Sequence, residues 1–274
     1  MARYRKTVLS LPAPRPGADH RLTLFLPDGP APAAGRATLW YLDGNAAAQD
    51  LDAATLDAIP GPGAPVLICL GHEGAERFAS LERTRDYTPE GQATDPRGRP
   101  AGGAPSFWQR LTEQLIPAAE AHFTADPTAR QLWGHSYGGL FVLRAALLAG
   151  PPNLFSGFIA ASPALWWNHA GYLARLHAAL EAGQRPQAPI AFHTGGAERE
   201  RASQPSDPTA QPLLKMRAAL PPDALEGLVA AFARAGNPGA FTVFPGLSHG
   251  ETFTRSVRVA ALAAGADPGV TGQA

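Results

Sequence analysis

The chain has 274 residues, with 23 basic and 23 acidic side chains, and 45% of its residues are hydrophobic. This length suits one large domain or two small ones, and the apolar fraction can line a core, which argues against wholesale disorder. Zero net charge argues against nucleic-acid binding, because phosphates attract a basic surplus. A single cysteine excludes an internal disulfide framework and a cysteine-rich zinc site.

Several targeting and cofactor patterns are missing from the sequence. Lys6 and Lys215 are the only lysines, and no G-x-x-x-x-G-K-[ST] phosphate loop occurs. No apolar run reaches the roughly 18 residues of a membrane span, and the amino terminus has no signal-peptide pattern. We therefore expect a cytoplasmic protein that does not enter the membrane, and we expect it to be a monomer.

Short apolar runs alternate with longer Ala/Leu-rich stretches along the chain. The expected strands are Arg21–Leu26, Ala37–Leu42, Pro65–Gly71, Gln131–Gly134, Gly157–Ala161, Pro189–Thr194 and Ala240–Phe244. The expected helices are Phe107–Phe123, Gly139–Gly150, Ala170–Ala182, Asp223–Gly236 and Glu251–Ala264. This order predicts one α/β domain over residues 1–274, with a mostly parallel sheet and helices on both faces. We expect the first two of these strands to form an antiparallel edge.

Two stretches interrupt this alternation. Residues 86–105 are polar and rich in Gly and Pro, and residues 197–212 are polar with scattered prolines. Long loops without regular structure are uncommon in compact domains and often act as lids or binding loops. We predict loop insertions at both places, and a frayed tail after residue 264.

The most informative segment is G-H-S-Y-G at Gly134–Gly138, which matches the G-x-S-x-G nucleophile elbow. It follows an apolar strand and opens an apolar helix, which is the strand–turn–helix setting that the motif requires. We therefore predict that Ser136 is a nucleophile on a tight turn. We expect Gly134 and Gly138 to be glycines because side chains there would clash with the neighbouring strand and helix.

A serine nucleophile needs a base, and α/β-hydrolases carry their histidine after the serine and the acid in chain order. The downstream histidines are His169, His177, His193 and His249. His249 follows the last expected strand, so we predict that it is the base for Ser136. His177 falls in mid-helix and His193 inside a strand, where packing roles are expected.

The acid of a triad should follow the strand before the last one. Glu198 is the first carboxylate after Pro189–Thr194, so we predict that it orients the base. Glu200 and Asp207 are alternatives on the same stretch. If Glu198 is a solvated loop residue instead, a Ser–His dyad is the mechanism left open.

Acyl transfer also needs N–H donors for the developing oxyanion. One is the backbone N–H of Tyr137, the residue after the nucleophile. The second should lie on the loop after Ala37–Leu42, which reads D-G-N, and there we predict the N–H of Asn45. We expect Gly44 to let this backbone approach the substrate closely, a plain Asp-Gly turn being the alternative.

Several segments together resemble a known family. They are W-Y-L-D-G-N at Trp40–Asn45, R-T-R-D-Y-T-P at Arg83–Pro89, G-G-A-P-S-F at Gly102–Phe107, G-H-S-Y-G-G-L-F at Gly134–Phe141, A-S-P-A-L-W-W at Ala161–Trp167 and L-S-H-G at Leu247–Gly250. In these segments the chain resembles the putative-esterase family of α/β-hydrolases. Within it, the chain is most similar to the trilactone siderophore esterases that act on enterobactin and salmochelin.

This resemblance implies an esterase that opens ester or lactone bonds of a catecholate siderophore so that iron is released. It also implies that Arg83, Arg85 and Trp166 bind substrate, because arginines suit an anionic catecholate and tryptophan can stack on its ring. The alternatives are a surface ion pair of Arg85 with Asp86 or Glu82, and core packing for Trp166.

The sequence therefore predicts a serine esterase of α/β-hydrolase fold that needs no metal or organic cofactor. Its expected partner is a small-molecule ester, with a ferric siderophore as a candidate, and neither nucleic acid nor membrane is expected. Two alternatives are a general carboxylesterase or thioesterase of the same fold, and a non-catalytic hydrolase-like module that binds a siderophore.

Overall fold

The computed structural model describes residues 3–13, 19–61, 63–74, 76–147, 154–202, 211–237 and 239–265. Its strands are β1 (Tyr4–Leu11), β2 (His20–Pro27), β3 (Arg36–Tyr41), β4 (Val66–His72), β5 (Ala125–His135), β6 (Gly157–Ala161), β7 (Ile190–Gly195) and β8 (Phe241–Phe244). They form an eight-stranded sheet in the order β1-β2-β4-β3-β5-β6-β7-β8. The β1–β2 and β2–β4 pairs are antiparallel, and the other neighbours are parallel.

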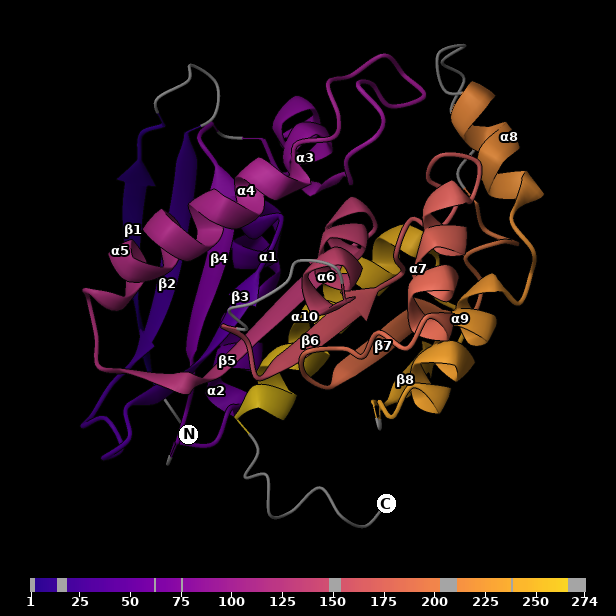
Figure 1. The fold of residues 1–274 in the computed structure, drawn as a ribbon. Helices are drawn as coiled ribbons and strands as arrows, with labels where there is room; N and C mark the ends of the chain where they lie inside the picture. The colour runs from indigo at the N-terminus through magenta and orange to yellow at the C-terminus, as the bar shows by residue number, and fades with distance from the viewer. Residues whose placement is uncertain are drawn as a thin grey trace.

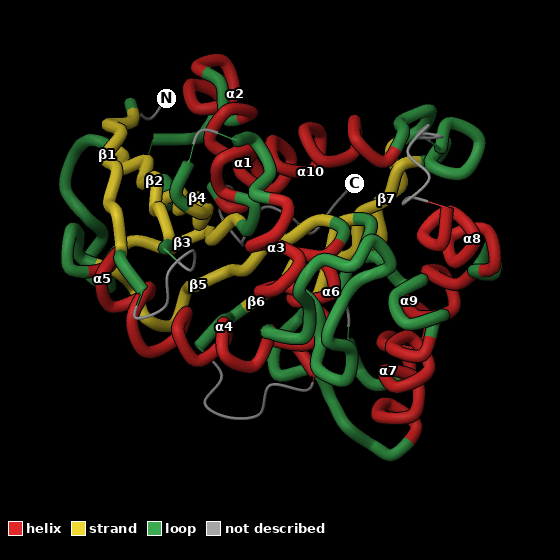
Figure 2. The backbone as a smooth tube through the Cα atoms, turned by 90° about the horizontal axis from the view of Figure 1, so that it is seen from above, coloured by secondary structure: helices red, strands yellow, loops and turns green. Residues whose placement is uncertain are grey.

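Helices cover both faces of this sheet (Figures 1 and 2). One face carries α1 (Gly44–Asp50), α2 (Ala53–Ala58) and α10 (His249–Ala264). The other carries α4 (Ala104–Arg110), α5 (Ile116–Glu120), α6 (Tyr137–Leu147), α7 (Gly171–Glu181) and α9 (Ala224–Arg234). The helix α3 (Ser80–Tyr87) packs against α4 and α6, and α8 (Gln211–Ala219) lies at the rim of the molecule.

The sheet divides the apolar core into two layers. On one side, Phe253 and Val257 of α10 pack with Ala46 of α1 and with side chains of β3 and β4. On the other side, α6 is buried along its whole length. All of β4 is buried as well, as expected for a strand whose two faces are both covered by helices. These layers hold the carboxyl ends of the central parallel strands at one edge.

The predicted α/β class is confirmed, but the predicted antiparallel edge is wrong. β2 and β3 are not neighbours, because β4 lies between them and pairs antiparallel with β2. β4 is buried along its whole length and pairs on both sides, with β2 on one edge and β3 on the other. The antiparallel edge is β1–β2, and β1 escaped prediction because its half-exposed, charged residues give a weak strand pattern.

The first of the two predicted irregular stretches is shorter than predicted. Residues 86–105 begin inside α3 and end inside α4, and the loop between them carries an isolated bridge from Thr94 to Pro100. The expected helix Phe107–Phe123 is α4 and α5 joined by a π-helical segment, η1 (Leu111–Leu115). Of the predicted insertion at 197–212, residues 203–210 lie outside the described part, as do 148–150 and the tail from 266 onward. Among the described helices, none has both the length and the apolar character needed to cross a membrane.

Candidate active site

Ser136 lies at the sharp turn between β5 and α6. Its φ is 58°, in the left-handed region that a non-glycine residue enters only at a cost. Two backbone contacts hold this conformation: its N–H donates to the carbonyl of Ala161 at 3.0 Å, and its carbonyl accepts the N–H of Ala164 at 3.1 Å. The predicted strand–turn–helix setting of Ser136 is therefore present.

The glycines of the elbow differ in how much room they have. A Cβ on Gly134 would lie 2.4 Å from the carbonyl oxygen of Gly138, so a side chain is excluded there. A Cβ on Gly138 would meet nothing closer than Leu42 Cβ at 3.5 Å, which is ordinary contact. The predicted clash is therefore correct for Gly134 and wrong for Gly138. The tight position is Gly139, where a Cβ would lie 2.9 Å from Pro163 Cα.

His249 and Glu198 meet although they are far apart in sequence. His249 is the first residue of α10, and its Nδ1 lies 2.8 Å from Glu198 Oε2. The other carboxylate oxygen, Oε1, accepts hydrogen bonds from the Ser162 hydroxyl and from the N–H of Gly195 at 2.8 Å. Sequence reasoning did not anticipate Ser162, although the A-S-P segment at the end of β6 contains it.

These three donors favour the ionised form of Glu198. Burial by itself raises the pKa of Glu198, but the hydrogen bonds from His249, Ser162 and Gly195 outweigh it and lower that pKa. An ionised carboxylate only accepts, so Nδ1 of His249 carries a proton, and in the neutral ring this tautomer leaves Nε2 as the acceptor. A histidine in this tautomer can take a proton from a hydroxyl, which is what a general base does.

A close backbone contact joins the loop of Glu198 to the start of α10. A Cβ on Gly195 would lie 2.3 Å from both the Leu247 carbonyl oxygen and Thr252 Oγ1. Only glycine fits there, so β7 ends directly against the segment that carries His249. The spacing of Glu198 and His249 therefore depends on this backbone contact as well as on their hydrogen bond.

The competing residues are placed differently. Asp207 lies outside the described residues, and Glu200 is exposed on the surface. His193 is buried in β7 with Nδ1 2.8 Å from Ser256 Oγ, and burial lowers its pKa to about 4, as suits the expected core histidine. His177 is half-buried on α7.

His135, the residue before Ser136, was not predicted to take part. Its ring lies 4.4 Å, between centroids, from the ring of His249, and its Nε2 lies 3.0 Å from the His249 carbonyl oxygen. Because a carbonyl only accepts, His135 must carry a proton on Nε2. Burial, with a smaller contribution from His249, holds its pKa well below the usual range, so it is neutral. His135 thus holds the first residue of α10, the predicted base His249, beside the elbow.

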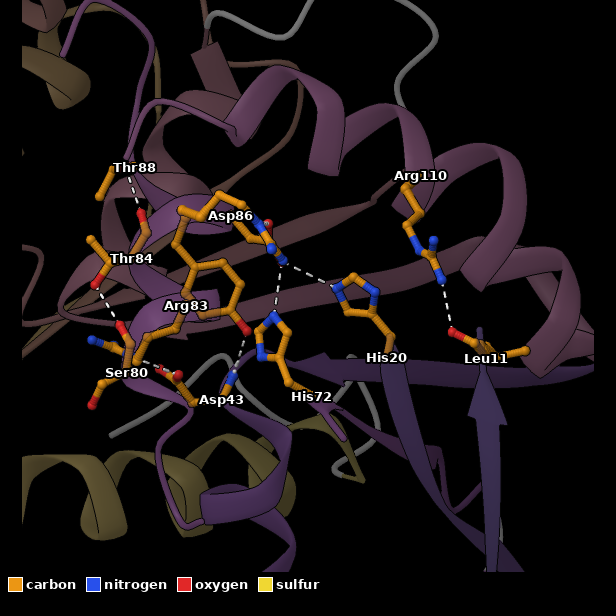
Figure 3. A network of polar contacts seen from close by, with 12 residues as sticks. Leu11, His20, Asp43, His72, Ser80, Arg83, Thr84, Asp86, Thr88 and Arg110 are labelled. Atoms are coloured by element: carbon orange, nitrogen blue, oxygen red, sulfur yellow. Dashed lines mark hydrogen bonds and ion pairs between the residues drawn. The ribbon is translucent and has the colours of Figure 1, made fainter. Parts of the chain in front are cut away.

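The loop after β3 is held by α3 (Figure 3). Asp43 has a φ of 53°, and its N–H donates to the Tyr87 hydroxyl at 3.1 Å. Its carboxylate accepts from both Nε and Nη2 of Arg83, at 2.7 and 2.9 Å. Such a forked pair has a fixed geometry, so α3 sets the path of the D-G-N loop. Arg83 was predicted to bind substrate, and the structure engages its guanidinium in this inward ion pair.

Gly44 and Asn45, the next two residues of this loop, were predicted to approach the substrate and to donate an N–H to the oxyanion. A Cβ on Gly44 would lie 2.3–2.4 Å from backbone atoms of Cys69 and Leu70, so this glycine makes room for β4 rather than for a ligand. The Asn45 side-chain amide donates to the carbonyls of His72 and Glu76. Its backbone N–H remains the predicted oxyanion donor, together with that of Tyr137.

Arg85 and Trp166 adopt the alternatives that the sequence left open. Arg85 pairs with Asp86, with its Nε 2.6 Å from Oδ1. Trp166 is 6% exposed and packs between the Tyr137 ring at 5.6 Å and the Arg217 guanidinium at 5.4 Å. These placements favour an ion pair and core packing over substrate contact.

A cavity of about 480 Å³ opens beside Tyr137. The Tyr137 hydroxyl donates to Asp95 at 3.3 Å, and the Tyr137 ring meets Trp167 edge-on. Asp95 and Trp167 both line the cavity. The remaining lining residues come from the loop after α3, the loop after β6 and α8: Gln92, Thr94, Pro96, Asn168, His169, Gln211, Pro212, Lys215 and Met216. Neither predicted arginine nor Trp166 is among them.

The sheet order, the elbow on β5, and the carboxylate after β7 that meets the histidine after β8 together define the α/β-hydrolase fold. The family described as Putative esterase matches residues 13–254, and the chain belongs to this family. The apo-salmochelin esterase of Escherichia coli O6:H1 (strain CFT073) is 35% identical over 58% of this chain and 51% of its own, so the match spans about half of that relative. The ferri-bacillibactin esterase BesA of Bacillus subtilis (strain 168) is 30% identical over 82% of this chain and 81% of its own. The solved structure titled Enterobactin and Salmochelin Hydrolase IroE has a TM-score of 0.75 and 28% identity, covering 96% of each chain.

Proposed function

We propose that this protein is a serine esterase that cleaves carboxylic ester or lactone bonds through an acyl-enzyme. The observation that carries the proposal is the hydrogen bond from His249 Nδ1 to Glu198, on a helix start that lies against the turn of Ser136. A solvated glutamate with a lone histidine would not be held by three donors. The arrangement supports a Ser–His–Glu triad over the dyad.

In the proposed mechanism, His249 Nε2 removes the proton from Ser136 as Oγ attacks the ester carbonyl. Glu198 stabilises the imidazolium that forms, because the carboxylate stays ionised. The N–H groups of Tyr137 and Asn45 stabilise the oxyanion, and the protonated His249 then gives its proton to the leaving alcohol. Water then attacks the acyl-enzyme while His249 takes its proton, and His249 returns this proton to Ser136 Oγ as the acid product leaves.

We further propose that the substrate is a catecholate siderophore or a related aryl ester. The names of the relatives support this choice, since they are esterases of salmochelin and bacillibactin. The cavity beside Tyr137 supports it as well. Trp167 offers it an aromatic wall and the exposed Lys215 a cation, which together suit an anionic aromatic ring.

A general carboxylesterase is the second candidate, and one observation favours it. The two arginines expected at the substrate are engaged by Asp43 and Asp86. Among the residues that the structure describes, Lys215 is then the only lysine or arginine that lines the cavity. Comparing kcat/KM for a catecholate trilactone with that for simple aryl esters separates the two. A preference for simple esters would exclude the siderophore substrate.

The esterase proposal is tested by fluorophosphonate labelling and by hydrolysis of 4-nitrophenyl acetate. We expect the wild type to be labelled and active, and Ser136→Ala to lose both. Ser10→Ala, at an exposed position of the edge strand β1, is the matched control and should behave as the wild type. Covalent labelling of Ser136→Ala, or turnover by it at the wild-type rate, would refute the mechanism.

A further inference from the structure

A second group of polar side chains joins β2, β4 and α3 (Figure 3). His20 and His72 stand directly opposite each other in the antiparallel register of β2 and β4, so their side chains share one face of the sheet. Asp86 reaches them from α3. Its Oδ2 lies 2.8 Å from His72 Nε2 and 3.3 Å from His20 Nε2. All three residues are buried.

His20 is the unexplained member of this group. It is 2% exposed, yet neither of its ring nitrogens has a hydrogen-bond partner, because its 3.3 Å approach to Asp86 lacks hydrogen-bond geometry. A buried polar group without a partner costs free energy and calls for an explanation, such as an ion that is bound there. Figure 3 shows the His20 ring turned toward the carboxylate of Asp86.

We propose that His20, His72 and Asp86 form a binding site for a divalent transition-metal ion, with Zn²⁺ as the best match. Two imidazoles and one carboxylate are a common ligand set for this ion. One ligand atom from each residue lies within 4.8 Å of the others. Tetrahedral bonds of about 2.0–2.1 Å place ligand atoms roughly 3.3 Å apart, so small side-chain movements bring this set around one ion.

Of two arginines near the site, one competes with a metal for Asp86 and limits its affinity. Arg85 donates from Nη2 to the same Asp86 Oδ2 at 3.0 Å and therefore competes with a metal for that oxygen. Its Nε on Oδ1 would remain as the contact that orients the carboxylate. Arg110 directs its guanidinium to the carbonyls of Leu11 and Pro12, away from Asp86. We therefore infer a site of moderate affinity.

The metal would act on structure rather than on the ester. It would fasten α3 to β2 and β4, and α3 carries Arg83 and Tyr87, which hold Asp43. The ion thus stabilises the loop after β3 without contacting the reacting atoms. This inference does not depend on the proposed esterase activity.

The test is a titration of the metal-free protein with Zn²⁺ and Co²⁺, followed by thermal unfolding and visible absorption. We expect a single Co²⁺ to give the intense bands of a tetrahedral site, and saturating Zn²⁺ to raise the Tm by about 5 °C. His20→Gln should fold with a near-normal Tm without metal, because His20 donates no hydrogen bond, and should lose both responses. His122→Gln, at an exposed histidine, is the matched control and should keep them.

Arg85→Gln provides the opposite change. Removing the competing cation should tighten metal binding by about tenfold, and an unchanged or weaker affinity would contradict the role of Asp86 as a ligand. Equal binding by the wild type and His20→Gln would assign the metal to surface histidines and overturn the proposal. No uptake by the wild type would overturn it as well.

Discussion

The molecule contains two histidine–carboxylate pairs with the same 2.8 Å contact and different surroundings. The side chains of His249 and Glu198 are 31% and 20% exposed, whereas those of His72 and Asp86 are 3% and 8% exposed. The second oxygen of Glu198 is held by neutral donors, and that of Asp86 by the Arg85 guanidinium. Glu198 therefore keeps a full negative charge that can stabilise an imidazolium, whereas the charge of Asp86 is already balanced by the Arg85 guanidinium.

The largest effect should follow from removing the accessible histidine. His249→Ala is expected to lower kcat for aryl esters by about 10⁴- to 10⁶-fold, because Ser136 then has no base. The loss should appear without a change in Tm. His177→Ala, on α7, should retain full activity, and a His249→Ala rate within tenfold of the wild type would disprove the role of His249 as the base.

Neutralising the carboxylate of the accessible pair should have the next largest effect. Glu198→Gln is expected to lower kcat by about 10²- to 10⁴-fold, since the amide cannot stabilise the imidazolium or hold the same tautomer. Glu200→Gln is the matched control two residues away and should leave kcat unchanged. If both variants kept the wild-type rate, the site would be a Ser–His dyad.

Changing the buried pair, His72 and Asp86, should alter the free energy of unfolding rather than the catalytic rate. Burial alone raises the pKa of Asp86, but the facing His20 and His72 rings and the hydrogen bonds from Arg85 lower it far below its usual range. Its ionised form therefore stabilises the fold at neutral pH. This contribution is lost progressively as the pH falls below about 4, which is the pKa of an aspartate in the unfolded chain.

Asp86→Asn tests this assignment. We expect a loss of about 3 kcal/mol in the free energy of unfolding at pH 7, because Arg85 and His72 lose their buried anion. Urea unfolding should show the gap to the wild type narrowing at pH 3. The exposed Asp57→Asn, on α2, should show no such change, and a pH-independent gap would mean that the charge of Asp86 is not the cause.

The smallest effect should come from trimming one donor of the accessible pair. Ser162→Ala removes one of the three hydrogen bonds to Glu198 and should lower kcat by about tenfold, as a bond to a charged group of about 1.5 kcal/mol would. Ser156→Ala, an exposed serine before β6, is the control. A rate that does not move would show that Gly195 and His249 suffice to hold the carboxylate.

Local patterns and chain order predicted more of this molecule than contacts between distant segments. The turn of Ser136 was predictable because its glycines, strand and helix are contiguous. The positions of Glu198 and His249 followed from the order of the last two strands. The role of each residue in the reaction stays a prediction until the variants are measured.

The remaining features depend on pairings that no local pattern encodes. His20 meets His72 only because β2 lies beside β4, and an apolar run does not reveal which strand it pairs with. The partner of Arg83 is Asp43, 40 positions earlier, so charge alone suggested a ligand instead. Trp166 could equally stack on a substrate or pack under the elbow, because an indole ring suits both environments.

Three neighbouring strands end in residues with left-handed backbone: Asp43 after β3, Ser136 after β5 and Ser162 after β6, with φ of 53°, 58° and 41°. Each such residue costs about 1–2 kcal/mol, and glycine would relieve the cost. At Asp43, however, glycine would leave the buried Arg83 guanidinium without its partner, which costs about 3 kcal/mol or more and exceeds the strain relieved. At Ser162, glycine would remove a donor to Glu198. Stability therefore cannot be gained at these strand ends without losing contacts that hold the candidate site.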